Sequence, residues 1–356
     1  MTAASAGTSA AGFVAVLLAA LPTSAAEPGF VPVDVRAHPI AEFRIGQPGT
    51  RFGVFEFRGG LALSSTDAAF GAWSGLDFAA DGQTVYAVSD TGVWFTARLV
   101  EDQGRLVGID NPMLAPMLDD DGQPLTGKAK SDAEGLRIVR RDGVETALVS
   151  FEQTPDVRVF AAAPDLARAT PRHVALPGFV SRIRANQGLE ALAVAPADGR
   201  LGGATVVIAE RSLDKNRDHR AFVLDGPGDG PFSIRRIGDF DVTDAAFLPT
   251  GDLLILERKF RPSEGLAMRI RRIAGSAIAP NATVDGPALI EAGAGYQIDN
   301  MEGLAVRSGR DGETLVNLIS DDNHSLLQRT VLLQFVLRPA APPLPRLRPE
   351  ASASSP

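Results

Sequence analysis

Short apolar strands recur along this chain in pairs, and each pair is joined by a polar loop that mostly contains glycine. The first strand of a pair begins at an acidic or small polar residue, and the second ends on a carboxylate. The five copies read SGLDF…VYAVSD, EGLRI…ALVSFE, EALAV…VVIAE, DAAFL…LLILE and EGLAV…LVNLISD, over residues 74–90, 134–152, 190–210, 244–257 and 302–321. Their starts are spaced by roughly 57 residues, and a strand hairpin repeated at such a period is typical of a β-propeller.

The pattern therefore predicts an all-β fold, a β-propeller of four-stranded antiparallel blades, and the repeats give five blades. Strand-like segments also lie outside the repeats, at 28–64 and at 331–337. An N-terminal strand that completes the last blade closes the ring and removes a free sheet edge. The alternative is a sixth, irregular blade built from residues 28–70 and the C-terminal strand.

Two recurring positions in each copy are expected to meet at one mouth of the propeller. In an antiparallel hairpin the start of the first strand and the end of the second lie at the same edge. The first ring of positions is Ser74, Glu134, Glu190, Asp244 and Glu302, and the second is Asp90, Glu152, Glu210, Glu257 and Asp321. All of them except Ser74 are carboxylates.

Carboxylates crowded around a narrow mouth repel one another, so some must protonate, pair with Arg or Lys, or hold a cation. Hard oxygen ligands in this number suit Ca²⁺ better than Zn²⁺. We therefore expect Ca²⁺ as cofactor, and the predicted ligands are Asp90, Glu134, Glu152, Glu190, Asp244, Glu302 and Asp321. The competing interpretation is a solvated rim of acidic residues that serve as salt-bridge partners.

Composition narrows the function classes. The net charge of −8 disfavours generic binding to nucleic acid, and the lack of cysteine excludes thiolate metal sites and a Cys nucleophile. The sequence has no G-x-S-x-G nucleophile elbow, P-loop or dinucleotide fingerprint. A monomer that acts on a small anionic ester is the expectation that remains.

The N-terminus suggests export. Residues 1–26 carry no charge, and the apolar run AGFVAVLLAAL at 11–21 is too short to span a bilayer. The small-residue segment PTSAA follows it, so we predict a signal peptide over 1–26, although no Lys or Arg precedes the run. An uncleaved N-terminus is the alternative. The mature chain is then a single propeller domain over 27–337 with a disordered Pro-, Ala- and Ser-rich tail over 338–356, in a periplasmic or secreted protein.

Several strings resemble the blocks of a known family. KSDAEGLRIV, FEQTPDVRVF, NQGLEALAV, LILERKF and NMEGLAV…LISDDN are similar to those of the phytase-like, esterase-like propeller family, from about Gly59 to Leu337. The resemblance implies a β-propeller that hydrolyses phosphate or carboxylic esters. The block positions it matches are Glu134, Asn186, Glu190, Glu210, Glu257, Arg258, Glu302, Asp321, Asp322 and Asn323.

The resemblance and the chemistry together nominate a mixed catalytic set, which is Glu210, Arg211, Glu257, Arg258, Asp322 and Asn323. Arginine pairs with phosphate or carboxylate through two parallel hydrogen bonds. The expected function is a Ca²⁺-assisted hydrolase of phosphate or other esters at the channel mouth. The alternative is a non-catalytic propeller that binds a ligand or protein, in which Ca²⁺ and these ion pairs only brace the blades.

Overall fold

The computed structural model describes residues 29–141, 143–162, 165–178, 180, 183–184 and 187–339. The predicted signal peptide, Asn186 and residues 340–356 of the tail lie outside these described residues. Within them, no helix is long and apolar enough to cross a membrane.

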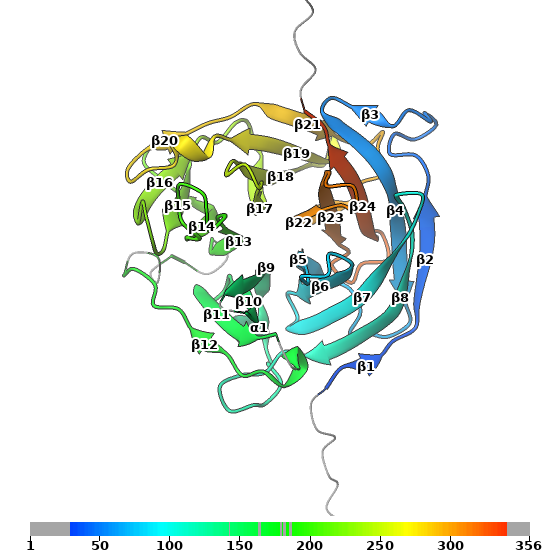
Figure 1. Cartoon of the computed structure of the whole chain (residues 1–356), viewed down its shortest axis with the longest axis horizontal. Helices are drawn as coiled ribbons and strands as arrows, with labels where there is room; N and C mark the ends of the chain where they lie inside the picture. The colour runs from blue at the N-terminus through cyan, green and yellow to red at the C-terminus, as the bar shows by residue number, and fades with distance from the viewer. Residues whose placement is uncertain are drawn as a thin grey trace, which may run out of the picture.

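Five mainly antiparallel sheets surround a central axis, as Figure 1 shows. The innermost strand of each sheet contacts the innermost strands of the two neighbouring sheets, and this closes a ring. These inner strands are β5 (Trp73–Phe78), β9 (Ala133–Arg141), β13 (Leu189–Val194), β17 (Asp241–Phe247) and β22 (Asn300–Ser308). The predicted five-bladed β-propeller is confirmed.

In blades 1 to 4 the other strands follow the inner strand in chain order, from the axis outward. Blade 1 adds β6 (Thr84–Ser89), β7 (Val93–Asp102) and β8 (Arg105–Pro116), with β1 (Val31–Pro32) at its edge, and blade 2 adds β10 (Val144–Phe151), β11 (Asp156–Ala161) and β12 (Arg172–His173). Blade 3 adds β14 (Thr205–Leu213), β15 (His219–Val223) and β16 (Gly230–Ile234), and β20 (Thr283–Val284) pairs with β16 in parallel. Blade 4 adds β18 (Leu253–Arg261), β19 (Gly265–Ile273) and β21 (Ala288–Ala292). The helical turns are α1 (Lys128–Ser131) and two 3₁₀ turns, Leu166–Arg168 and Gly275–Ala277.

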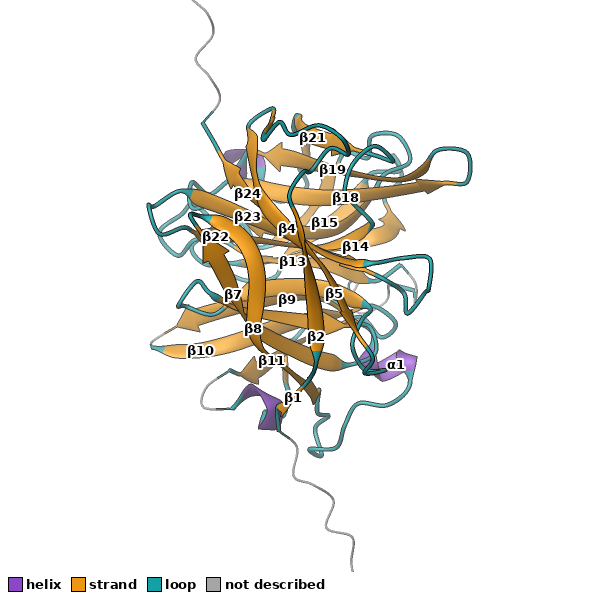
Figure 2. Ribbon diagram, turned by 90° about the vertical axis from the view of Figure 1, so that its right-hand side faces the viewer, coloured by secondary structure: helices purple, strands orange, loops and turns teal. Residues whose placement is uncertain are grey.

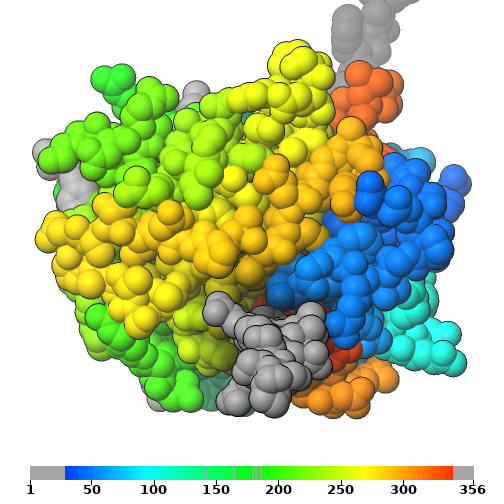
Figure 3. All heavy atoms as spheres, turned by 90° about the horizontal axis from the view of Figure 1, so that it is seen from above, coloured from blue at the N-terminus to red at the C-terminus, as the bar shows by residue number. Residues whose placement is uncertain are grey.

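Blade 5 joins the two ends of the chain. Its strands are β22, β23 (Thr314–Asp321), β24 (Thr330–Leu337), β4 (Phe55–Ser65) and β2 (Val35–Ile40), with β3 (Arg51–Phe52) paired to β4. The N-terminal residues suggested for a sixth blade instead supply the outer strands of the fifth, so the sixth-blade alternative is wrong. In Figure 3 the blue N-terminal segment lies against the orange segment before blade 5, where the Ile45 amide donates to the Gly295 carbonyl at 3.0 Å.

The hydrophobic core is divided among the five blade interfaces. Each of the five buried apolar clusters combines side chains from two adjacent blades. The cluster between blades 5 and 1, for example, combines Trp73 with Ile319, and between blades 1 and 2 Trp94 meets Phe160 edge to face. No single blade buries its own faces, so the ring as a whole fixes the position of the channel mouth.

Every inner hairpin carries a one-residue β-bulge near the mouth of the channel. The extra residues are Ser74, Glu134, Glu190, Thr243 and Glu302. Bulges bend the strand and re-aim the side chain at the bulged position, and they occur often beside active sites. The repeated bulge therefore directs one side chain per blade to the mouth.

Candidate functional site

In blade 4 the residues at the two mouth positions are shifted by one from those that the sequence pattern predicts. Val242 pairs with Glu257, whereas the corresponding inner pair in blade 5 is Met301 with Ser320. Thr243 and Arg258 therefore occupy the two mouth positions of this blade. Successive side chains on a strand point to opposite faces, so Asp244 and Glu257 do not lie in the two rings of mouth residues that the sequence pattern predicts.

Glu257 lies behind the mouth in a fully buried ion-pair network. Its carboxylate receives Arg269 Nε at 2.6 Å and Arg271 Nη1 at 2.8 Å, both from the neighbouring strand β19. Neither Glu257 nor Arg271 has any exposed surface. For Glu257 this arrangement agrees with the alternative interpretation, in which the ion pairs only brace the blades. Arg258, the next residue, faces the mouth.

Asp244 lies deeper in the channel, below the ring of bulges. It accepts hydrogen bonds from Arg137 Nη2 at 2.8 Å and from the backbone amides of Ala245 and Leu304, both at 2.7 Å. Its side chain is fully buried. The carboxylate serves as the counter-ion of Arg137 and is held away from the other predicted metal ligands.

The other carboxylates of blades 2 and 3 converge in two groups that share Glu152. Asp132, Glu134 and Glu152 place one oxygen each within 4.8 Å of one another, and so do Glu152, Glu190 and Glu210. Asp132 was missed by the sequence analysis, although its position two residues before Glu134 is a usable signal. Residues two apart on a strand share a face.

The same two-residue offset places Asn300 beside Glu302 in blade 5. Its side-chain amide donates to Glu302 at 2.8 Å and reaches Asp321 at 3.5 Å, so it links the two predicted ligands of this blade. In blade 1, Asp90 pairs with Lys128 of α1 at 3.2 Å, and the same ammonium lies 3.2 Å from Asp132.

Two arginines face these carboxylates from blades 3 and 4. Arg258 lies between blades, with Nε 3.1 Å from Glu302 and Nη2 3.5 Å from Glu210. Arg211 lies farther out, 3.2 Å from Asp241 and 3.5 Å from Glu210, and more than half of its side chain is exposed. The positive charges thus extend from solvent into the carboxylate cluster.

Asp322 and Asn323 follow β23 and sit at the edge of this cluster. Asp322 accepts from the Ala72 and His324 amides, both at 3.0 Å, and from the Thr330 hydroxyl at 2.9 Å. These bonds fasten the loop to blade 1. Asn323 is exposed at the rim, and its backbone amide donates to Asp321 Oδ1 at 2.6 Å.

Burial and mutual repulsion raise the pKa of most mouth carboxylates. Burial is the largest cause in each case, and it raises the pKa of Glu152 to about 7, that of Glu302 to about 8 and that of Asp321 to about 6. The pKa values of Glu134 and Glu190 are raised well above the usual range by burial and then by neighbouring carboxylates. Without a cation, part of this cluster is therefore protonated at neutral pH.

The donor set fits a hard divalent cation. Asp90 Oδ1 is buried and accepts no hydrogen bond from the described residues. Gly188 passes so close to Glu152 that a Cβ there would lie 2.3 Å from the Glu152 carbonyl oxygen, so only glycine allows this approach. Buried carboxylate oxygens with unused lone pairs, gathered from several strands, are the ligands that Ca²⁺ takes in proteins.

A family model described as "Phytase-like: Esterase-like activity of phytase" matches residues 68–324. One similar solved structure is a glucose dehydrogenase, with 11% identity, a TM-score of 0.43, and coverage of 78% of this chain and 98% of that one. Another, titled "Structure of U3-55K", has 12% identity, a TM-score of 0.36, and coverage of 76% and 68%. A search of curated proteins finds no match. Because the family model spans well over half of the sequence, the chain belongs to the phytase-like family, the one described by the esterase-like activity of phytase.

Proposed function

We propose that this protein is a Ca²⁺-assisted hydrolase of phosphate or other esters, with its site at the carboxylate mouth of the propeller. The observation that carries the proposal is the pair of carboxylate groups joined at Glu152, with Arg258 and Arg211 beside them. The residues that would hold a cation are Asp132, Glu134, Glu152, Glu190 and Glu210, with Asp90, Glu302 and Asp321 next to them. A bound divalent cation would polarise the ester oxygens and offset negative charge that develops on them.

The exposed cations at the mouth are suited to capture of an anionic substrate. Arg211 and Lys128 have side chains that are 57% and 64% exposed, whereas that of Arg258 is 24% exposed. An anionic ester that meets the outer pair is drawn toward the inner arginine, whose planar guanidinium suits two parallel hydrogen bonds. Arg258 then exchanges part of its pairing with Glu210 and Glu302 for the substrate.

Asp321 is placed to accept the proton of an attacking water. Burial raises the pKa of this carboxyl to about 6 in the metal-free chain, and a neighbouring cation would lower it and keep the carboxylate ionised. The Asn323 backbone amide holds one of its oxygens at 2.6 Å, and the Asn300 side chain lies 3.5 Å from the other. Asn323 therefore contributes by positioning Asp321.

The test is hydrolysis of p-nitrophenyl phosphate and p-nitrophenyl acetate by the metal-stripped protein, before and after Ca²⁺ is added. We expect turnover that depends on Ca²⁺ and is lost in Glu152→Gln, because that residue belongs to both carboxylate groups. Glu291→Gln, an exposed substitution on β21, is the matched control and should keep full activity. Turnover that survives complete chelation would refute the metal-assisted mechanism.

The second candidate is a non-catalytic propeller in which Ca²⁺ stabilises the ring. The deep burial of Glu190 and Glu210 favours it, because a cation enclosed by protein ligands has no open position for substrate. A Ca²⁺-dependent rise in melting temperature without hydrolysis of any ester would support this function.

Export to the periplasm or medium also remains a proposal, and fractionation of the native host with detection of the mature N-terminus tests it.

A further inference from the structure

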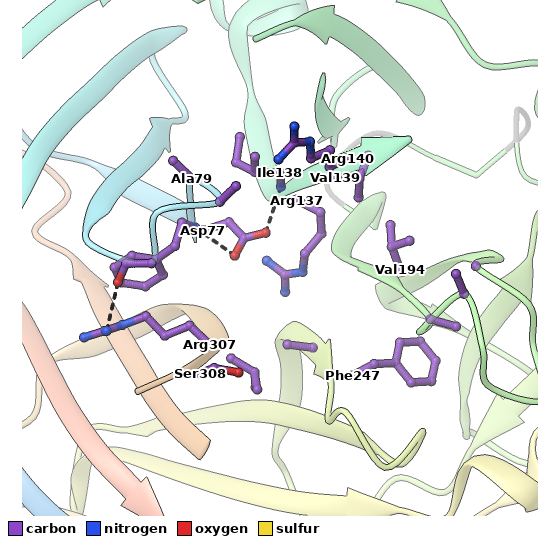
Figure 4. Close-up of a pocket in the computed structure, with 18 of the residues that line it drawn as sticks. Asp77, Ala79, Arg137, Ile138, Val139, Arg140, Val194, Phe247, Arg307 and Ser308 are labelled. Carbon is purple, nitrogen blue, oxygen red and sulfur yellow. Dashed lines mark hydrogen bonds between the residues drawn. The ribbon is translucent and has the colours of Figure 1, made fainter. Parts of the chain in front are cut away.

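Arg137 forms a plug across the channel, between the carboxylate mouth and the opposite end of the propeller. Its guanidinium pairs with Asp244 at 2.8 Å. It also donates to the carbonyls of Leu76 at 3.2 Å and Leu304 at 3.0 Å, as well as to that of Ala245. Figure 4 shows this side chain extending from β9 into the space between the blades. These bonds tie β9 to the inner strands of blades 1, 4 and 5, so the channel is obstructed between its two ends.

A cavity of about 550 Å³ lies beyond this plug, at the turn end of the inner strands (Figure 4). Its lining carries charges of both signs. Asp77 forms no ion pair with any described residue, Arg140 is exposed, and Arg307 pairs with Glu101 at 2.6 Å. Because neither sign of charge prevails, this cavity favours no single class of ligand.

A different cavity, of about 480 Å³, lies on the outer half of blade 3. Its walls come from the β14–β15 loop (residues 214–216), from β15 and β16, and from residues 281–283, which run into β20. In Figure 1, β16 and β20 lie at the periphery of the ring. The cavity is therefore separate from both ends of the channel. Its volume falls in the range that is usual for small-molecule sites.

The floor of this outer cavity is apolar. Phe222 of β15 and Pro231 of β16 pair directly across the two strands, and Phe222 is only 4% exposed. Arg220 precedes Phe222 by two residues on the same strand, so it projects from the same face, about 7 Å along the strand. A ligand whose apolar part covers this floor can therefore reach Arg220 with a polar group at its end.

The charged side chains of the outer cavity leave an excess of positive charge. Arg220 and Lys215 are both exposed, and neither forms an ion pair with a described residue. Asp214 is the carboxylate in the lining, and hydrogen bonds already occupy both of its oxygens. Oδ1 accepts from two backbone amides at 2.8 and 3.0 Å, and Oδ2 accepts from the Ser233 hydroxyl at 2.7 Å. Two cations thus face one carboxylate, and the lining carries a net positive charge.

Neutral donors stand beside these cations. Asn216, Asn281 and Thr283 line the same cavity, and all three are exposed. Their amide and hydroxyl groups can donate hydrogen bonds to an oxyanion. The polar part of the cavity therefore suits an anion better than a cation, and the apolar floor beside it suits a ring or a chain.

We propose that the outer cavity of blade 3 binds a small organic anion, with its charged group against Arg220 and Lys215 and its apolar part on Phe222 and Pro231. The planar guanidinium of Arg220 suits two parallel hydrogen bonds to a carboxylate or a phosphate. Burial of the apolar part adds affinity that a simple inorganic anion does not gain. The site is distinct from the proposed hydrolytic mouth and does not depend on Ca²⁺.

The test compares three probes with the metal-stripped protein in ligand-observed NMR. They are benzoate, benzamide, which keeps the ring and lacks the charge, and acetate, which keeps the charge and lacks the ring. We expect benzoate to bind at least tenfold more tightly than either of the others, with or without Ca²⁺. Arg220→Gln should weaken benzoate binding at least tenfold. Arg310→Gln removes an exposed cation outside the cavity and should leave the binding unchanged.

Two further variants locate the bound probe. Thr283→Trp, at an exposed position of the cavity wall, fills the cavity and should also weaken benzoate binding at least tenfold. Arg258→Gln alters only the carboxylate mouth and should leave it unchanged. The proposal is overturned if benzoate does not bind the wild-type chain, if benzamide or acetate binds as tightly, or if benzoate binding survives both Arg220→Gln and Thr283→Trp. Loss of binding in Arg258→Gln alone would place the probe at the mouth and would overturn it as well.

Discussion

Two adjacent residues of β18, Glu257 and Arg258, should respond to substitution in opposite ways. Glu257 is buried with Arg269 and Arg271, whereas Arg258 faces the carboxylate mouth. The perturbation is the pair Glu257→Gln and Arg258→Gln, each of which removes one charge and keeps a polar side chain.

The structure sets the size of each effect. Glu257→Gln leaves Arg269 without its carboxylate, and leaves Arg271 with only Asp285, whose side chain is 48% exposed. Removal of one partner from a buried ion pair costs about 3–5 kcal/mol. For a domain of about 300 residues the unfolding entropy is on the order of 0.6 kcal/mol/K, so the melting temperature should fall by about 5–8 °C.

Arg258→Gln should act on the site and leave the fold largely intact. The guanidinium lies 3.1 Å from Glu302 and 3.5 Å from Glu210, and it competes there with a cation for the same carboxylates. Its loss should tighten Ca²⁺ binding several-fold. If the mouth hydrolyses anionic esters, loss of a charged hydrogen bond of about 1.5–3 kcal/mol lowers kcat/KM by roughly 10- to 100-fold.

Calorimetric unfolding and Ca²⁺ titration of both variants, beside wild type, check the two expectations. Glu257→Gln should show the large fall in melting temperature with unchanged Ca²⁺ affinity. A stable Glu257→Gln that has lost Ca²⁺ binding, together with an Arg258→Gln that unfolds easily and binds Ca²⁺ normally, would show that the blade-4 register described above is wrong.

Three further predictions concern the carboxylate mouth. Burial raises the pKa values of Glu152, Glu302 and Asp321 to about 7, 8 and 6, above their values in the unfolded chain, so the metal-stripped protein should lose stability as the pH rises from about 5 to 8. Melting curves across that pH range should show this loss of stability in chelator and little of it in millimolar Ca²⁺. A gain of stability with rising pH in chelator would contradict the reasoning. Asp132→Asn should weaken Ca²⁺ binding at least tenfold by calorimetric titration, whereas the exposed Asp198→Asn should not; equal affinities would remove Asp132 from the ligand set. Gly188→Ala places a Cβ 2.3 Å from the Glu152 carbonyl and should destabilise the chain by about 1–3 kcal/mol in urea unfolding, so wild-type stability would show that this approach is not constrained.

The view perpendicular to the propeller axis in Figure 2 shows the β18–β19 hairpin and α1 projecting from the same face of the ring. Arg258 and Lys128 belong to these two elements, and both pair with mouth carboxylates. The structure therefore brings together cations from blade 4 and from the segment before blade 2, which lie about 130 residues apart in the chain. Their convergence depends on ring closure, which no local pattern encodes.

The sequence alone determined the fold class, the number of complete repeats and the family resemblance, because each blade repeats one hairpin with the same apolar alternation. It also indicated most of the mouth, including Glu134, Glu152, Glu190, Glu210 and Arg258. Those residues could be identified because the hairpin places the start of one strand beside the end of the next.

Only the tertiary structure decided the register of blade 4, the inclusion of Asp132 and the plug formed by Arg137. A strand has a side-chain period of two, so a one-residue difference in the position of a bulge exchanges Glu257 for Arg258 at the mouth without altering the apolar pattern. Arg137 meets Asp244 across 107 positions of sequence, and that contact exists only because five separate interfaces close the ring.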